Sequence, residues 1–139
     1  MSTLHKQPAI AVDCVIFDSG GRLLLIQRKN QPFKGKYALP GGFVEFGETT
    51  EAAARRELRE ETSLKVGQLR LVGVYSDPKR DSRGHTISVA YVAVVSRPIR
   101  VRGGDDAATA AFVPDWQRLK LAFDHNKIVR DAATITGAA

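Results

Sequence analysis

Two apolar segments rich in β-branched residues constrain the fold of this chain most. The first reads AIAVDCVIF from Ala9 to Phe17, and the second reads TISVAYVAVV from Thr86 to Val95. The first is typical of a strand covered on both faces, and the second predicts another strong strand. No apolar run reaches the ~20 residues needed to cross a bilayer. We therefore expect a sheet buried between other layers, and no membrane partner.

Shorter patterns predict the remaining elements of an α/β fold. The turn DSGG leads into a strand over 22–28, and a helix capped by Thr49 or Thr50 runs to about Thr62. Two further strands are expected over 69–76 and, more weakly, 109–113. Asp124 is placed to cap a last helix, HNKIVRDAATI. These elements predict a mixed sheet with a helix on each face.

The length and charge of the chain narrow the class of protein further. Its 139 residues suit one compact domain spanning 1–139. Lysine and arginine outnumber the acids 21 to 15, which favours anionic partners such as phosphates, nucleotides or nucleic acid, or simply gives a basic surface. Cys14 is the only cysteine, which excludes an internal disulfide and a four-cysteine zinc ribbon and suggests a core residue. The N-terminal sequence has no signal-peptide pattern, so we expect a cytoplasmic protein.

The helix predicted up to Thr62 carries an unusual group of acids near its C-terminal end. At 3.6 residues per turn, Glu57, Glu60 and Glu61 fall within one sector of roughly 100°. Like charges at this spacing cost about 0.2–0.5 kcal/mol per pair, and acids in the last turns also oppose the helix dipole. A divalent cation would reverse these penalties, and oxygen ligands suit Mg²⁺ or Mn²⁺. The alternative is a solvated charged face.

The neighbourhood of these acids is also informative. Ala53 and Ala54 are expected one turn earlier in the same sector, where small side chains would leave open space above the carboxylates. The loop LPGGFVEFGE, with Gly41 and Gly42, comes directly before the helix. Such glycines let the backbone approach a ligand, and either carbonyl oxygens for a metal or N–H groups for a phosphate fit the pattern. Neither GxxxxGK[ST] nor GxGxxG is present.

Together the loop and the helix resemble a known motif. Gly42, Glu48 and the segment RELREETSL from Arg56 to Leu64 resemble the Nudix box, G-x5-E-x7-R-E-U-x-E-E-x-G-U, where U is a bulky aliphatic residue. Ser63 alone departs from it, because the family has glycine there. A residue other than glycine costs roughly 1–2 kcal/mol in the left-handed conformation. Either the helix ends differently here, or the chain tolerates this cost.

The resemblance implies a fold and a set of residue roles. The family fold is an α/β/α sandwich around a mixed β-sheet, in agreement with the pattern above. Arg56 would pair with an acid of the box, with Glu48 as the first candidate, and hold the loop against the helix. One glutamate, or water held by it, would help to deprotonate the nucleophile. The implied metal ligands are Glu57, Glu60, Glu61 and the carbonyl oxygen of Gly41.

The resemblance also implies a reaction, the hydrolysis of a nucleoside diphosphate linked to another moiety with Mg²⁺ or Mn²⁺ as cofactor. The segment SDPKRDSRGHTISVAYVA, which contains Pro78, resembles that of ADP-ribose pyrophosphatases, so we favour hydrolysis of ADP-ribose to AMP and ribose 5-phosphate. Arg28 and Arg80 are the candidates for binding phosphate. Asp105 or Asp106 could be an additional acid or a turn residue. Either adenine stacking or core packing could explain Phe33, Tyr37 and Phe123.

Other functions stay open at this point. A pyrophosphatase for oxidised nucleoside triphosphates is the nearest alternative enzyme, whereas an NADH-cleaving relative would need a zinc ribbon that Cys14 alone cannot form. A non-catalytic nucleotide sensor on the same scaffold is the alternative of a different class. We do not expect a nucleic-acid partner, because the cations are scattered and do not alternate with aromatic residues. The number of copies is open, with a homodimer as one arrangement.

Overall fold

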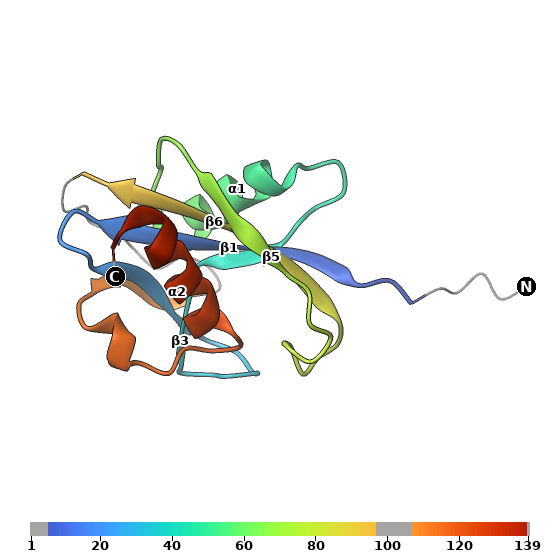
Figure 1. Ribbon diagram of the computed structural model, residues 1–139. Helices are drawn as coiled ribbons and strands as arrows, with labels where there is room; N and C mark the ends of the chain where they lie inside the picture. The colour runs from blue at the N-terminus through green and yellow to red at the C-terminus, as the bar shows by residue number, and fades with distance from the viewer. Residues whose placement is uncertain (1–5, 97–106, 139) are drawn as a thin grey trace, which may run out of the picture.

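The computed structural model describes residues 6–96 and 107–138. In these residues one mixed sheet is flanked by two helices (Figure 1). The helices are α1 (Thr50–Thr62) and α2 (His125–Thr136), with a short 3-10 turn at Trp116–Arg118. The strands are β1 (Ala9–Asp18), β2 (Leu23–Arg28), β3 (Tyr37–Ala38), β4 (Gly41–Phe43), β5 (Arg70–Tyr75), β6 (Thr86–Val95) and β7 (Ala107–Val113).

The two apolar runs form the centre of the sheet. β1 and β6 pair in parallel over their full length, from Ala9 opposite Thr86 to Asp18 opposite Val95. The strand order is β3-β2-β1-β6-β5, while β4 also pairs with β1 and β7 with β2. All pairings other than β1 with β6 are antiparallel. The prediction of a mixed sheet is therefore confirmed.

Alternate residues of the central strands face opposite layers, because side chains along a strand point to alternate faces. On one face of β1, Val12, Cys14 and Ile16 belong to a core cluster that includes Leu58 of α1. On the other face, Val15 and Phe17 belong to a cluster with α2, whose contribution is Ile128, Val129, Ala132 and Ala133. Figure 1 shows the two helices on opposite sides of the sheet. The α/β/α sandwich is thus confirmed, and Cys14 is a core residue as expected.

The ends of α1 lie where the sequence predicts them. The hydroxyl oxygen of Thr49 accepts a hydrogen bond from the Ala52 N–H at 3.0 Å, so Thr49 is the N-cap. Ser63 follows the helix in the left-handed conformation, with φ 63° and ψ 10°, and its N–H donates to the Arg59 carbonyl. The helix therefore ends where the family pattern has glycine, and the chain tolerates the backbone cost of Ser63.

Three expectations about local structure were wrong, one of them only in part. Ala53 and Ala54 are fully buried in the core beside the sheet, so they leave no open space above the carboxylates. Asp124 occupies the N-cap position of α2 as expected, but its side chain makes no capping hydrogen bond and binds Arg80 instead. The segment LPGGFVEFGE, expected to be a loop, contains the short strand β4, which pairs with β1, and the short strand β3 comes just before it and pairs with β2. Over the described part of the chain, no helix is long and apolar enough to cross a membrane.

Candidate active site

A cavity of about 380 Å³ opens between the glycine loop, α1 and the start of α2. It brings together most of the residues that the sequence singles out. Glu48 and Glu60 are not among the described residues that line it. The predicted site residues that line it are Arg28, Gly41, Arg56, Glu57, Glu61 and Arg80.

Two glycines of β4 allow the glutamates of α1 to lie against the backbone. A Cβ atom on Gly42 would come within 2.5 Å of the Glu57 carboxylate. A Cβ atom on Gly41 would lie 2.1 Å from the Val12 carbonyl oxygen of β1, and the Gly41 N–H donates to Glu61 Oε1 at 2.7 Å. Only glycine fits such a close approach without displacement of its neighbours. The loop therefore fixes where the carboxylates of Glu57 and Glu61 can sit.

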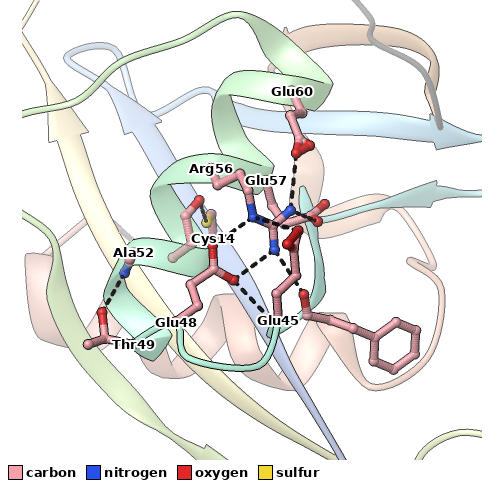
Figure 2. A network of polar contacts seen from close by, with 10 residues as sticks. Cys14, Glu45, Glu48, Thr49, Ala52, Arg56, Glu57 and Glu60 are labelled. Carbon is pink, nitrogen blue, oxygen red and sulfur yellow. Dashed lines mark hydrogen bonds and ion pairs between the residues drawn. The ribbon is translucent and has the colours of Figure 1, made fainter.

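Arg56 joins the loop to the acids of α1 (Figure 2). Its Nε and Nη2 atoms donate to both carboxylate oxygens of Glu48, at 2.7 and 3.0 Å. Its Nη1 atom donates to Glu57 at 2.6 Å and to Glu60 at 3.1 Å. The hydrogen bonds from Arg56 lower the pKa of Glu48 to about 2. The expected pair of Arg56 and Glu48 is present, and the same guanidinium offsets the repulsion between the glutamates.

The donor set near α1 suits a hard cation, although its three glutamates do not converge. Glu57 and Glu61 are in the cavity wall, and Glu61 is buried. Glu60 is 45% exposed and its carboxylate faces Arg56. Within residues 6–96 and 107–138, no three acid, His or Cys side chains are arranged to hold a metal together. The carboxylate oxygens of Glu57 and Glu61 fit Mg²⁺ or Mn²⁺, and Glu60 would join them only after leaving Arg56.

The two arginines predicted to bind phosphate have different surroundings. Arg80 is only 5% exposed, and Asp124 binds it through both oxygens at 2.6 and 2.9 Å. Burial disfavours its charge, but Asp124 and Asp13 outweigh this and raise its pKa. Arg28 donates from Nε to the Pro32 carbonyl at 2.7 Å, and its guanidinium carbon lies 5.0 Å from the Phe123 ring centroid. Both arginines line the cavity, but Arg80 is already held by two acids.

Sequence reasoning missed a buried polar group in the cavity wall. Asp13 of β1 accepts hydrogen bonds from Ser88 Oγ at 2.5 Å and from His125 Nε2 at 3.2 Å. The Leu39 N–H donates to His125 Nδ1, so Nε2 is the nitrogen that carries the proton toward Asp13. Burial raises the pKa of Asp13, but His125, Ser88 and Arg80 together lower it below its ordinary value. The sequence signal that could have revealed this group is Asp13 itself, an aspartate inside an apolar strand.

The aromatic candidates divide between packing and the cavity. Tyr37 packs against the core cluster on the α2 face, as core packing predicts. Phe123 packs partly on a small buried cluster and also lines the cavity. Phe33 is half-exposed and contacts Phe123 edge to face, with 4.9 Å between centroids, so it is not a core residue. Asp105 and Asp106 lie outside the described residues.

The chain is an α/β/α sandwich whose acidic helix is joined by Arg56 to a glycine loop. This combination defines a class of hydrolase domain that acts on phosphate compounds. Residues 7–133 match the model of the NUDIX domain, and the chain belongs to this family. It is 51% identical over 128 residues to an ADP-ribose pyrophosphatase of Methanocaldococcus jannaschii, a match that covers 92% of this chain and 75% of the relative. The family predicted from the sequence is thereby confirmed.

Other relatives pair the same domain with different functions. The chain is 36% identical to the ADPR responsive transcriptional repressor NtrR of Acinetobacter baylyi, over 92% of this chain and 54% of the repressor. A solved structure of the NUDIX domain of Shewanella oneidensis NrtR complexed with ADP ribose has a TM-score of 0.88 at 28% identity. That match covers 95% of this chain and 90% of the solved one.

Proposed function

We propose that the chain is a Nudix pyrophosphohydrolase that converts ADP-ribose and water to AMP and ribose 5-phosphate. One observation carries the proposal: Glu57 and Glu61 lie against Gly41 and Gly42 in the cavity wall of a chain 51% identical to an ADP-ribose pyrophosphatase. Nudix ADP-ribose pyrophosphatases are metal-dependent hydrolases, and we assign Mg²⁺, with Mn²⁺ as the alternative. The family match over 7–133 supports one domain across residues 1–139.

The proposed chemistry is attack of water on a phosphorus atom of the diphosphate. When bound, a divalent cation supplies charge neutralisation to the phosphate oxygens and lowers the pKa of water. Glu57, Glu61 and the Gly41 carbonyl would hold it, together with Glu60 once its side chain leaves Arg56. One of the glutamates accepts the proton of the attacking water as a general base. AMP and ribose 5-phosphate are the two products of the P–O cleavage.

Arg56 and Glu48 act on this chemistry by fixing positions. The carboxylate of Glu48 binds the edge of the Arg56 guanidinium formed by Nε and Nη2, while the Nη1 atom holds Glu57. Arg56 Nη2 also donates to the Phe43 carbonyl at 3.0 Å, so the strand that carries Gly41 and Gly42 is tied to the helix. We assign these two residues to positioning the carboxylates. Arg28 and Arg80 are assigned to the phosphate end of the cavity, which both of them line.

A second candidate function has specific support. The likeness to an ADPR responsive repressor, and to a NUDIX domain solved with ADP ribose, favours a sensor that binds the same ligand without cleaving it. Both functions need a cavity that accepts a nucleoside diphosphate. Only the enzyme needs carboxylates that bind a cation and accept a proton, and this chain has three glutamates at the box positions. Turnover therefore separates the two functions.

The test is a substrate panel with the purified full chain and Mg²⁺. The panel contains ADP-ribose, NADH, FAD, diadenosine polyphosphates and oxidised dGTP, and the products are identified by chromatography. We expect ADP-ribose to give the highest kcat/KM, with AMP and ribose 5-phosphate in equal amounts. Binding of ADP-ribose without turnover of any compound would establish the sensor instead. Faster turnover of oxidised dGTP would overturn the substrate assignment and leave the enzyme class intact.

A further inference from the structure

Arg83, in the loop between β5 and β6, is held in one orientation by a buried acid. Its Nε and Nη2 atoms donate to the two oxygens of Asp81, at 3.1 and 2.7 Å. The Arg83 backbone N–H donates to the same carboxylate at 3.0 Å. The Asp81 side chain is only 3% exposed. A bidentate pair with a buried carboxylate fixes the plane of a guanidinium group.

Two aromatic rings hold the same guanidinium at the cavity. Its central carbon lies 5.5 Å from the centroid of Phe123, which precedes α2, and 5.8 Å from that of Phe43, at the end of β4. Both distances are within the range of a cation–π interaction. Arg83, Asp81 and both phenylalanines line the cavity. The Arg83 guanidinium therefore lies at the cavity beside rings from two different parts of the chain.

One edge of this guanidinium faces away from its internal partner. A guanidinium has five N–H donors in a fixed fork, and Asp81 uses the edge formed by Nε and Nη2. Among the described residues, Arg83 Nη1 makes no hydrogen bond, and the side chain is 46% exposed. Arg80, by contrast, is buried and chelated by Asp124. Of these two neighbouring arginines, Arg83 is the one that can offer donors to a ligand.

The charges that line the cavity are distributed unevenly, and this distribution can orient a ligand relative to Arg83. At the α1 end Glu45, Glu57 and Glu61 outnumber the one cation, Arg56, that pairs with two of them. At the other end the cations Arg28 and Arg83 are associated with the Phe123 ring. A diphosphate without a cation would be repelled by the first group and attracted by the second. Arginine forks match phosphate oxygens in geometry as well as in charge. The cavity can therefore orient a diphosphate with one side toward the glutamates and another toward Arg83.

We propose that Arg83 binds a phosphate oxygen of the substrate's diphosphate through its Nη1 edge, pre-oriented by Asp81 and by the rings of Phe43 and Phe123. The inference rests on the proposed function and adds the residue that selects a diphosphate ligand. It also moves the main phosphate contact from Arg80 to Arg83. Arg80 is then a structural part of the cavity wall, where it joins Asp124 to Asp13.

The test compares Arg83→Gln with Arg70→Gln, a control at an exposed arginine of β5 that does not line the cavity. Calorimetry in buffer with EDTA measures binding of ADP-ribose. Displacement of ADP-ribose by adenosine, which has no phosphate, measures binding of adenosine. We expect Arg83→Gln to weaken ADP-ribose binding roughly 10- to 100-fold, the effect of a lost charged hydrogen bond, and to leave adenosine binding unchanged. Equal binding of ADP-ribose by the two variants, or an equal loss for adenosine, would overturn the proposal.

Two further variants keep the test decisive if Arg83→Gln alone disturbs the loop. The double variant Asp81→Asn with Arg83→Gln leaves no buried unpaired charge and is expected to bind ADP-ribose as weakly as Arg83→Gln. Arg83→Lys keeps the charge without the planar fork and is expected to bind with intermediate affinity. In the enzyme, the change is expected in KM and not in kcat. Because binding needs no turnover, an inactive wild type refutes the proposed function alone, whereas unchanged binding by Arg83→Gln refutes this inference alone.

Discussion

Gly42 provides a quantitative test of how the glycine loop positions the carboxylates. It pairs with Val12 of β1, and a Cβ atom built on it would lie 2.5 Å from the carboxylate of Glu57. Ordinary van der Waals contact begins at 3.4 Å, so the Gly42→Ala variant must displace that carboxylate by about 0.9 Å. The clash falls on the end of a side chain, so the helix and strand can keep their places.

The expected effect of Gly42→Ala is a large loss of activity with little loss of stability. A misplacement of about 1 Å can reduce a rate by about 100-fold, and we expect a fall of this order in kcat/KM for ADP-ribose. Gly42 does not have a left-handed backbone, so alanine is compatible with its conformation. The smaller entropy of the unfolded chain would even offset part of any strain, by about 0.4–1 kcal/mol.

The assay is steady-state hydrolysis of ADP-ribose with Mg²⁺, accompanied by thermal unfolding of each variant. Gly67→Ala is the matched control, because a Cβ atom there has no neighbour within 4 Å. Gly41→Ala should behave differently, since its Cβ would lie 2.1 Å from a backbone oxygen of β1 and would separate the paired strands. Equal activity of Gly42→Ala and Gly67→Ala would refute the idea that this glycine fixes Glu57.

Two further predictions concern the helix end and the ion pair. Ser63→Gly should relieve the left-handed backbone and stabilise the protein by about 0.5–1 kcal/mol. Thermal unfolding should show a melting temperature higher by a few degrees. An unchanged or lower melting temperature would show that Ser63 is not strained. Glu48 has a pKa lowered from its ordinary 4.5 to about 2 by Arg56, so its stabilising effect is complete above pH 4.5 and is lost as the pH falls toward 2. Urea unfolding should therefore show a steeper loss of stability between pH 5 and 2 for the wild type than for Glu48→Gln, and parallel curves would contradict this.

The longer helices and strands could be predicted from the sequence because the residue patterns that indicate them are local. The apolar run that ends at Val95 gives β6 with the same bounds, and the threonine cap and the acidic pattern place α1 within one residue. The short strands β3 and β4 were not accessible. Each has only two or three residues in a segment rich in glycine and proline, and each forms by pairing with a longer strand. No periodic pattern can be read over so few residues.

The site was only partly accessible, because its remaining residues meet through tertiary packing. Spacing along the helix placed Glu57 and Glu61 together, and the family resemblance added Gly41. It did not show that Arg56 would draw Glu60 away from them, since the angle around a helix does not fix the direction of a long side chain. Asp124 was expected to cap α2, but Arg80, 44 residues earlier in the chain, competes for its carboxylate.

The most direct test of the central claim is hydrolysis of ADP-ribose by the wild type and by Glu61→Gln, with Mg²⁺ present. The substitution keeps an oxygen that can accept the Gly41 N–H bond and removes only the charge and the basic oxygen. We predict that the wild type releases AMP and ribose 5-phosphate and that Glu61→Gln turns over about 100-fold more slowly or worse, while it still binds ADP-ribose. Full activity in Glu61→Gln would contradict the assignment of this glutamate to the cation site.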